Sequence, residues 1–173
     1  MKAVLVIDSP LGLLQLTAVE DGLTALSFLD DASPPIATAD ADAATPLLQR
    51  ARAQLQDYFR GARSAFDLPL QPQGTPFQQA VWRALQTVPY GQTTRYALLA
   101  QRLGLPARHA RAVGAAVGRN PLLIIAPCHR IVGHDGRLTG YAAGLPRKQA
   151  LLDLERAASI PAQNPAPHRP RAA

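Results

Sequence analysis

Side chains that could cross-link this 173-residue chain or hold a metal are scarce. Cys128 is its one cysteine, so no disulfide can form within the chain. The four histidines are scattered along the sequence, at His109, His129, His134 and His168. Together with a single cysteine they give no spacing typical of a zinc site. We therefore expect no internal disulfide, no metal and no other cofactor.

Long apolar runs are missing as well. The apolar start behind Lys2 is interrupted by Asp8, well short of the core of a signal peptide. Elsewhere no stretch approaches the roughly eighteen apolar residues that span a bilayer. With 47% hydrophobic residues the chain can still bury an ordinary core, as one domain or two small ones. The sequence predicts a globular, cytoplasmic protein with no membrane partner.

Acidic side chains are few in the second half. Residues 75–158 carry 11 lysines and arginines against 3 aspartates and glutamates, and residues 159–173 carry 2 against none. Residues 1–74 show the opposite balance, 5 against 9. This asymmetry predicts a basic module that binds a polyanion, with nucleic acid as the favoured partner. The alternative is a basic face that is only solvated.

The first half alternates apolar stretches with turn-forming ones. Three strands of a β-meander are predicted, at residues 2–7, 11–19 and 24–29. Residues 30–44 have no periodic apolar pattern and predict a loop. Thr45 and Pro46 then predict the start of a helix that ends at Gly61. An extended linker is expected at 66–72.

The second half begins with helical signals. Thr75, Pro76 and Gln78 predict a helix start with a capping box. Thr93 or Thr94 is expected to cap a second helix, which stops at Gly104. A third helix follows, from about 107 to 118. Two short helices joined by a glycine-containing turn are typical of a helix-turn-helix, although such hairpins also arise in helical domains that bind no DNA.

Small side chains dominate the third helix. Arg108 and Arg111 share its surface with alanines and glycines, whereas helices that read base edges usually present Arg, Asn or Gln. Such a face favours binding of DNA through phosphates and groove shape, with Arg111 as the longest projection. Close packing against a neighbouring helix is the alternative for the same small residues.

The remaining residues are expected to form short elements around the cysteine. We predict a buried strand at 122–126, a hairpin at 131–138, a loop at 139–144, a helix from Pro146, and a disordered tail over 159–173.

Cys128 lies in the stretch from Ile124 to Val132, with His129 and Arg130 directly after it. A thiol with a pKa of about 8.5 needs a base or a positive field to become nucleophilic at neutral pH. His129 can reach the sulfur only if Pro127 breaks the strand and a turn begins there. A lone cysteine among apolar residues is otherwise most often an inert core residue.

Several motifs occur together and in order. They are Arg111-Ala112-Val113-Gly114, Asn120-Pro121, Pro127-Cys128-His129-Arg130-Ile131-Val132, Gly140-Tyr141, and Arg147-Lys148 ahead of Leu151-Leu152 and Glu155. Between about 75 and 157 the chain closely resembles the O6-alkylguanine-DNA alkyltransferases, the methylated-DNA-protein-cysteine methyltransferases. Residues 1–74 resemble that family's variable amino-terminal domain only loosely.

The resemblance implies an α/β (α+β) fold in three parts. Residues 1–74 would form a small mixed α/β, ribonuclease-H-like domain with the linker, and residues 75–158 a mainly helical, winged helix-turn-helix alkyltransferase domain, followed by the tail. It also implies a function. A monomer would move an alkyl group from guanine O6, and from thymine O4, in duplex DNA to its own cysteine, once.

The resemblance also assigns site residues. Cys128 would be the nucleophile, His129 would take its proton through a water, and Glu155 would orient His129. Asn120 would hold the cysteine turn, and Tyr96 would help rotate the nucleotide and donate to the leaving guanine. Other DNA contacts would come from Arg111, which would enter the base stack, and from Arg95, Arg108, Ala112 and Ala115. The substrate pocket would include Val117, Pro127, Tyr141 and Ala142.

Ala142-Ala143-Gly144 departs from the Arg-Trp pair of many bacterial members, which predicts a wider pocket. Three other functions compete with repair. The first is a non-catalytic sensor of alkylated guanine, although such relatives carry another residue in place of the cysteine. The second is a helix-turn-helix regulator, and the third is a Cys-His hydrolase, which would catalyse repeated turnovers.

Overall fold

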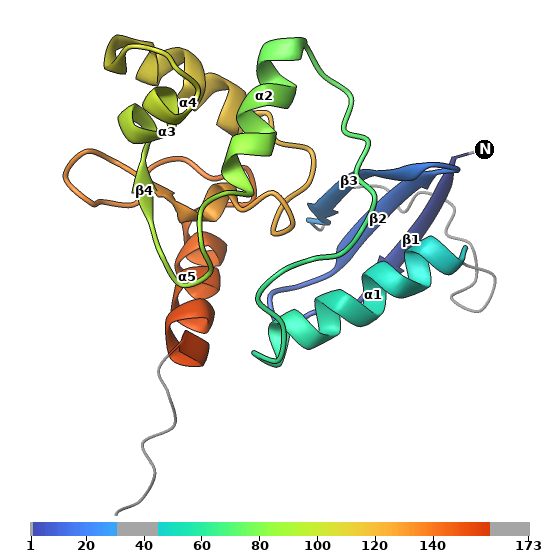
Figure 1. Cartoon of the computed structure of the whole chain (residues 1–173). Coiled ribbons are helices and arrows are strands. Elements are labelled where there is room, and N and C mark those ends of the chain that lie inside the picture. The colour runs from blue at the N-terminus through green and yellow to red at the C-terminus, as the bar shows by residue number, and fades with distance from the viewer. Residues whose placement is uncertain (1, 31–44, 160–173) are drawn as a thin grey trace, which may run out of the picture.

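A computed structural model describes residues 2–30 and 45–159, which form two units (Figure 1). The first contains β1 (Ala3–Ile7), β2 (Leu14–Val19), β3 (Gly22–Phe28) and α1 (Pro46–Phe59). The second contains α2 (Pro76–Leu85), β4 (Thr94–Arg95), α3 (Tyr96–Arg102), α4 (Ala110–Gly118), β5 (Ile131–Val132) and α5 (Leu145–Ser159), with 3₁₀ turns at Ala107–His109 and Cys128–Arg130.

The three-stranded sheet has the order β1-β2-β3 with both pairs antiparallel, so the predicted meander is confirmed. β2 begins at Leu14 and not at Leu11, because Ser9 to Gly12 closes a turn in which the Gly12 N–H donates to the Ser9 carbonyl at 3.1 Å. Gly12 has φ 115°, a conformation that favours glycine. The predicted loop at 30–44 lies, after Asp30, outside the described residues.

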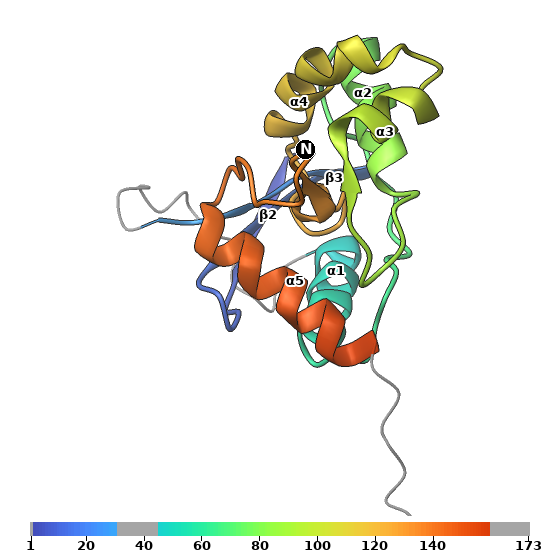
Figure 2. The ribbon, with the colours of Figure 1, turned by 90° about the vertical axis from the view of Figure 1, so that its left-hand side faces the viewer.

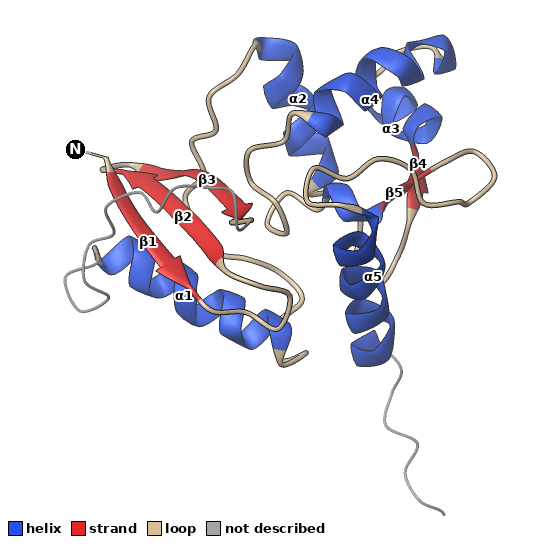
Figure 3. Ribbon diagram, turned by 180° about the vertical axis from the view of Figure 1, so that it is seen from behind, coloured by secondary structure: helices blue, strands red, loops and turns tan. Residues whose placement is uncertain are grey.

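α1 packs across one face of this sheet (Figure 3). Its start is the predicted one, since the Thr45 hydroxyl accepts from the Leu48 N–H at 3.4 Å and Pro46 is the first helical residue. The helix buries one stripe at three-to-four-residue spacing, made of Leu48, Ala51, Gln54, Leu55 and Tyr58.

The open edge of β3 joins the two units. The Leu23 N–H donates to Pro69 O at 2.9 Å, so the linker runs beside β3 as a parallel bridge through Leu70. Further along the same edge, Leu26 exchanges two hydrogen bonds with the second unit, to Pro121 O at 2.8 Å and from the Leu123 N–H at 3.0 Å. An edge that would otherwise expose unpaired backbone groups is thus covered from within the chain.

The helical unit confirms the predicted hairpin of helices, with α3 and α4 joined by a turn at Gly104, and α2 packed against both (Figure 2). The capping box is present, with both Thr75–Gln78 hydrogen bonds formed. The predicted cap of α3 was wrong. Arg95 occupies the N-cap position without a side-chain hydrogen bond, because Thr94 is drawn into β4, where it pairs with Ile131.

Two predicted β elements near the cysteine were wrong. Residues 122–126 are buried but form tight turns, closed by the Ala126 N–H donating to Leu122 O at 2.9 Å. Residues 131–138 contribute only β5, whose partner is the distant β4 in a parallel pair, so no hairpin strand forms. The apolar pattern at 122–126 indicates burial and not a strand, because a buried turn contains the same kinds of apolar side chain as a buried strand.

α5 starts at Leu145 and includes Ser159, whose hydroxyl donates to Glu155 O at 2.7 Å. Ser159, the first residue of the predicted tail, is therefore helical, and the rest of that prediction, 160–173, lies outside the described residues. Among the described helices none is long and apolar enough to cross a bilayer.

We expect Thr75→Ala to lower the free energy of unfolding by about 1 kcal/mol, because α2 loses the hydroxyl that accepts from the Gln78 N–H. Urea denaturation measures the change. Thr93→Ala is the matched control, since Thr93 is exposed and lies outside the caps of the described helices. Equal losses in the two variants would contradict the assigned cap.

Candidate active site at Cys128

Cys128 opens a 3₁₀ turn, Cys128–Arg130, directly after Pro127. The Arg130 N–H donates to Pro127 O at 3.0 Å and closes the turn. Because the chain curls here, Cys128 and His129 do not point to opposite faces as neighbours on a strand would. The turn predicted after the proline is confirmed.

The loop in front of this turn is held by Asn120. Its side-chain Nδ2 donates to Ala126 O at 2.7 Å, and its Oδ1 accepts from the Leu122 N–H at 3.0 Å. Ile124, inside the loop, has φ 70°, which is a strained conformation for a β-branched residue. The buried amide of Asn120 thus bridges both ends of the loop that delivers Cys128.

The sulfur is almost covered but borders a cavity. Cys128 is 4% exposed and contributes to the wall of a pocket of about 280 Å³. The other lining residues come from α3, α4 and the loop before α5, and they are Tyr96, Gly114, Val117, Gly118, Gly140, Tyr141 and Ala142. Pro127 does not line this pocket and lies at a different one, beside Tyr90 and Arg130.

Burial raises the pKa of the Cys128 thiol to about 11, although the Asn120 side chain and the positive charge of Lys148 act in the opposite direction. The sulfur therefore carries its proton at neutral pH. A thiol in this state becomes a nucleophile only when a neighbouring base removes the proton as the reaction proceeds.

His129 can be that base. Its ring is fully buried, and its Nε2 lies 2.7 Å from Glu155 Oε1. Burial lowers the pKa of His129, against the opposing influence of Glu155, so the ring is neutral at pH 7. An ionised carboxylate can only accept, which puts the ring hydrogen on Nε2. Nδ1 then has a free lone pair, and it is buried without a hydrogen-bond partner in the described part of the chain.

Glu155 on α5 is the centre of the polar network. Burial opposes its charge, but hydrogen bonds from His129 and Arg130 lower its pKa to about 2. Arg130 donates from Nε to Oε2 and from Nη2 to Oε1, both at 2.9 Å, and the Gly91 N–H donates to Oε2 at 3.0 Å. Tyr58 of α1 donates its hydroxyl to Oε1 at 2.8 Å. The predicted pairing of Glu155 with His129 is present in this network.

Lys148 is a second buried charge near the thiol. Its Nζ donates to the carbonyls of Ile131 at 2.5 Å, Thr139 at 2.6 Å and Gly140 at 3.4 Å. These bonds tie α5 to the segment that carries Tyr141, and the charge favours a thiolate at Cys128.

Sequence reasoning assigned no role to Tyr58, Gly91 or Lys148, and it treated Arg130 only as a source of charge. The one signal for Lys148 is its spacing, since it precedes Leu151 and Leu152 by three and four residues and so shares their buried face. Nothing in the sequence distinguishes Tyr58 from an apolar helix residue, because its partner is 97 residues away.

α4 presents a basic face of small residues. Arg111, Ala112 and Ala115 are exposed on it, while Val113, Ala116 and Val117 are buried against the helical unit. The packing interpretation holds for the inward positions, and the DNA interpretation of the outward ones stays a prediction. Gly114 lies against Tyr96, where an added Cβ would come within 3.6 Å of the ring, while Ala112 and Ala115 leave the outer surface free for a close approach.

Of the other predicted contact residues, Tyr96 lines the pocket and two arginines are exposed. Arg95 and Arg108 are exposed at the starts of α3 and of the 3₁₀ turn before α4. Tyr96 is half-buried, and its hydroxyl accepts from Thr139 Oγ1 at 3.2 Å. Tyr96 and the cysteine therefore line the same pocket, together with Gly114 of α4.

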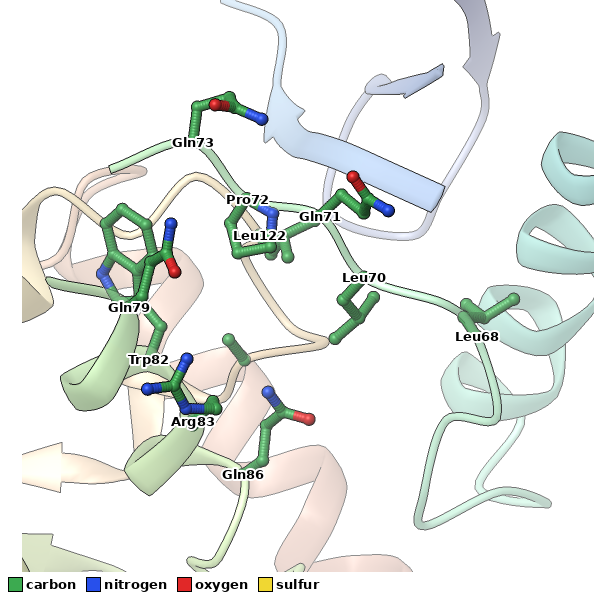
Figure 4. A pocket seen from close by; sticks show the side chains of 11 residues that line it. Leu68, Leu70, Gln71, Pro72, Gln73, Gln79, Trp82, Arg83, Gln86 and Leu122 are labelled. Atoms are coloured by element: carbon green, nitrogen blue, oxygen red, sulfur yellow. The ribbon is translucent and has the colours of Figure 1, made fainter. Parts of the chain in front are cut away.

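A larger cavity, of about 520 Å³, lies between α2 and the linker (Figure 4). Gln79 and Arg83 of α2, and Gln86 directly after it, line the cavity opposite the linker residues Leu70 and Gln71. Within the described chain its walls include neither cysteine nor histidine. This cavity is larger than the one at Cys128, but the chain's one cysteine lies at the smaller one.

Two family models match nearly the whole described chain. Residues 76–157 match the 6-O-methylguanine DNA methyltransferase, DNA binding domain, and residues 4–72 match the ribonuclease-like domain of the same proteins. A methylated-DNA--protein-cysteine methyltransferase from Methanosarcina barkeri is 47% identical over 150 residues, which cover 87% of this chain and 94% of that protein. One from Mycolicibacterium paratuberculosis is 46% identical over 150 residues, covering 87% and 90%.

Solved structures agree with these matches. O6-methylguanine methyltransferase from Mycobacterium tuberculosis superimposes with a TM-score of 0.83 at 45% identity, over 94% of this chain and 96% of that one. The M. tuberculosis OGT structure in complex with DNA gives 0.81 at 46% identity, over 90% and 94%. The two-unit α/β fold, the cysteine turn and these matches together show that the chain belongs to the 6-O-methylguanine DNA methyltransferase family.

Proposed function

We propose that this protein repairs DNA by moving the alkyl group from O6 of guanine, and from O4 of thymine, in duplex DNA to Sγ of Cys128. The observation that carries the proposal is a protonated, buried sulfur at the wall of a pocket, with a neutral histidine and a fixed carboxylate behind it. The relatives' names and the DNA complex of a relative support DNA as the partner.

In the reaction, a bond forms between Sγ and the alkyl carbon while the bond from that carbon to guanine O6 breaks. The electron pair of the broken bond stays with guanine, which takes up a proton, so the products are a thioether and ordinary guanine. His129 Nδ1 accepts the thiol proton through a water, and Glu155 stabilises the imidazolium that results. Tyr96, at the pocket wall, donates toward the leaving base.

The lesion must leave the base stack to reach Cys128. Arg111, exposed on α4, fills the space left in the stack, and Ala112 and Ala115 allow the helix to lie close to the groove. Arg95 and Arg108 bind phosphates and set the register of the complex. Val117, Tyr141 and Ala142 surround the flipped base, and Pro127 acts indirectly, by starting the turn.

The protein should act once. A thioether is not cleaved by the groups around Cys128, and the chain has no second cysteine that could take the alkyl group over.

We also propose that a monomer suffices, because the relay and the DNA face belong to one chain. We propose that the protein acts in the cytoplasm, where a free thiol stays reduced. The proposed division of labour is a supporting domain at 1–74 and a DNA-binding, reacting domain at 75–158.

Incubation with duplex DNA containing O6-methylguanine should add one methyl group per protein, on the peptide that contains Cys128. Intact mass and peptide mapping measure this, and Cys128→Ser should gain nothing. Binding of the damaged duplex without a mass gain would favour the non-catalytic sensor, and continued product release would favour a hydrolase.

Arg111→Ala should slow repair in duplex DNA about tenfold or more while leaving the reaction with free O6-benzylguanine almost unchanged, because only the duplex requires base flipping. Arg83→Ala is the matched control, an exposed arginine beside the larger cavity. Equal slowing on both substrates would remove Arg111 from the flipping role.

The rate of alkyl transfer from O6-benzylguanine should fall in acid, with its midpoint below pH 6.5. Burial lowers the pKa of His129 from that value, and protonation removes the base, so the rate is lost as pH falls through the lowered pKa. His129→Gln should be slow at every pH, while His134→Gln, at an exposed histidine, should keep the wild-type profile. A midpoint above 6.5 would contradict a neutral buried base.

A further inference from the structure

The amino-terminal unit contributes one side chain to the network behind the cysteine. Tyr58, in the last turn of α1, is completely buried, and its hydroxyl lies 2.8 Å from Glu155 Oε1. It crosses from the sheet-and-helix unit to α5 of the helical unit. Among the described hydrogen bonds, this one links the first unit directly to the relay.

The oxygen that Tyr58 contacts is the one that orients His129. Glu155 Oε1 accepts from Tyr58 at 2.8 Å and lies 2.7 Å from His129 Nε2. Donors that share one carboxylate oxygen compete for its charge and restrict its position. The strength and direction of the hydrogen bond to His129 therefore depend on Tyr58.

Tyr58 can act only as the donor in this pair. Burial, and then the negative charge of Glu155, raise the pKa of its hydroxyl far above the ordinary value, so it keeps its proton. Glu155 is ionised and accepts. The ring is held by neighbours on several sides, with its centroid 5.6 Å from that of Phe66 and 6.0 Å from that of Tyr90.

We propose that Tyr58 is a positioning residue for alkyl transfer, through which the amino-terminal unit fixes Glu155 and so sets the basicity of His129. This inference rests on the proposed function. Removal of the hydroxyl leaves more negative charge on Oε1 for His129, which makes protonated His129 more stable. The same loss frees one oxygen of the carboxylate from a fixed contact.

Beside Glu155, the charges of Arg130 and Lys148 act on His129, and two more titratable groups, Cys128 and Tyr90, belong to the surrounding segments. Arg130 faces Glu155 from the cysteine turn, Lys148 lies on α5, and Cys128 is the adjacent residue. Tyr90, before β4, has the Arg130 guanidinium over its ring at 5.6 Å. All of these are unchanged when only the Tyr58 hydroxyl is removed, so the substitution isolates that one contact.

The test compares Tyr58→Phe with wild type by following transfer of the benzyl group from O6-benzylguanine to Cys128 across pH. We expect the acid midpoint of the rate to move to higher pH. We also expect the rate above the midpoint to fall about three- to tenfold, in line with the net loss of one ordinary hydrogen bond that holds Glu155 in place. If the pH midpoint of the Tyr58→Phe rate equals that of wild type or is lower, the proposal is overturned, whatever the maximal rate of the variant.

Tyr90→Phe is the matched control. Tyr90 belongs to the same aromatic cluster, and its hydroxyl is buried without a hydrogen-bond partner in the described residues. Its variant should keep the wild-type midpoint, and a shift equal to that of Tyr58→Phe overturns the proposal. If wild type gains no benzyl group on Cys128, the proposed function itself has failed, whereas a reacting wild type with coincident profiles rejects only the role of Tyr58.

Nuclear magnetic resonance of the wild-type protein gives a second measurement that does not depend on a variant that folds. Because Tyr58 and His129 both donate to Glu155 Oε1, beside Arg130 Nη2, the Tyr58 hydroxyl proton should exchange slowly with water and show a nuclear Overhauser contact to the His129 Nε2 proton. Absence of that contact overturns the shared-acceptor arrangement.

Discussion

The buried charge of Glu155 is the constraint on which the site depends. A carboxylate with no exposure is tolerated only when donors surround it, and here four residues from three parts of the chain supply them: Tyr58 of α1, Gly91 before β4, and His129 and Arg130 of the cysteine turn. Each residue that donates a hydrogen bond to Glu155 is held in position by that bond. The tautomer of His129, the path of the cysteine turn and the contact between the two units all follow from one ion.

The β3 edge has a complementary role at the level of the backbone. Leu23 binds the linker and Leu26 binds the loop at 121–123, so a strand of the first unit guides both the entry to the helical unit and the loop that Asn120 closes. The amino-terminal unit therefore supports the reacting cysteine in two independent ways, through main-chain pairing at the loop and through Tyr58 at the relay.

What could be predicted from the sequence was mostly local. Thr45 and the Thr75–Gln78 box marked two helix starts correctly, because a cap is formed by residues within three positions of each other. The cap at Thr94 failed because a distant partner decides it, the pairing of β4 with β5. The strand at 122–126 failed for a local reason, because the buried amide of Asn120 holds these residues in a turn that has the same apolar pattern as a strand. The motif residues around Cys128 were found through family resemblance, whereas Tyr58 and Lys148 were missed because their partners are defined only in three dimensions.

The high pKa of Cys128 has a chemical consequence of its own. Oxidation by peroxides and disulfides begins with attack by a thiolate, so its rate rises with the fraction of thiolate and with access to the sulfur. Cys128 is 4% exposed and has a pKa of about 11, so both factors are small. A protein whose cysteine can react only once loses its activity if an oxidant modifies that cysteine before the alkylated base binds. Because the sulfur stays protonated next to His129, it is protected from oxidation and remains available for reaction with a single damaged nucleotide.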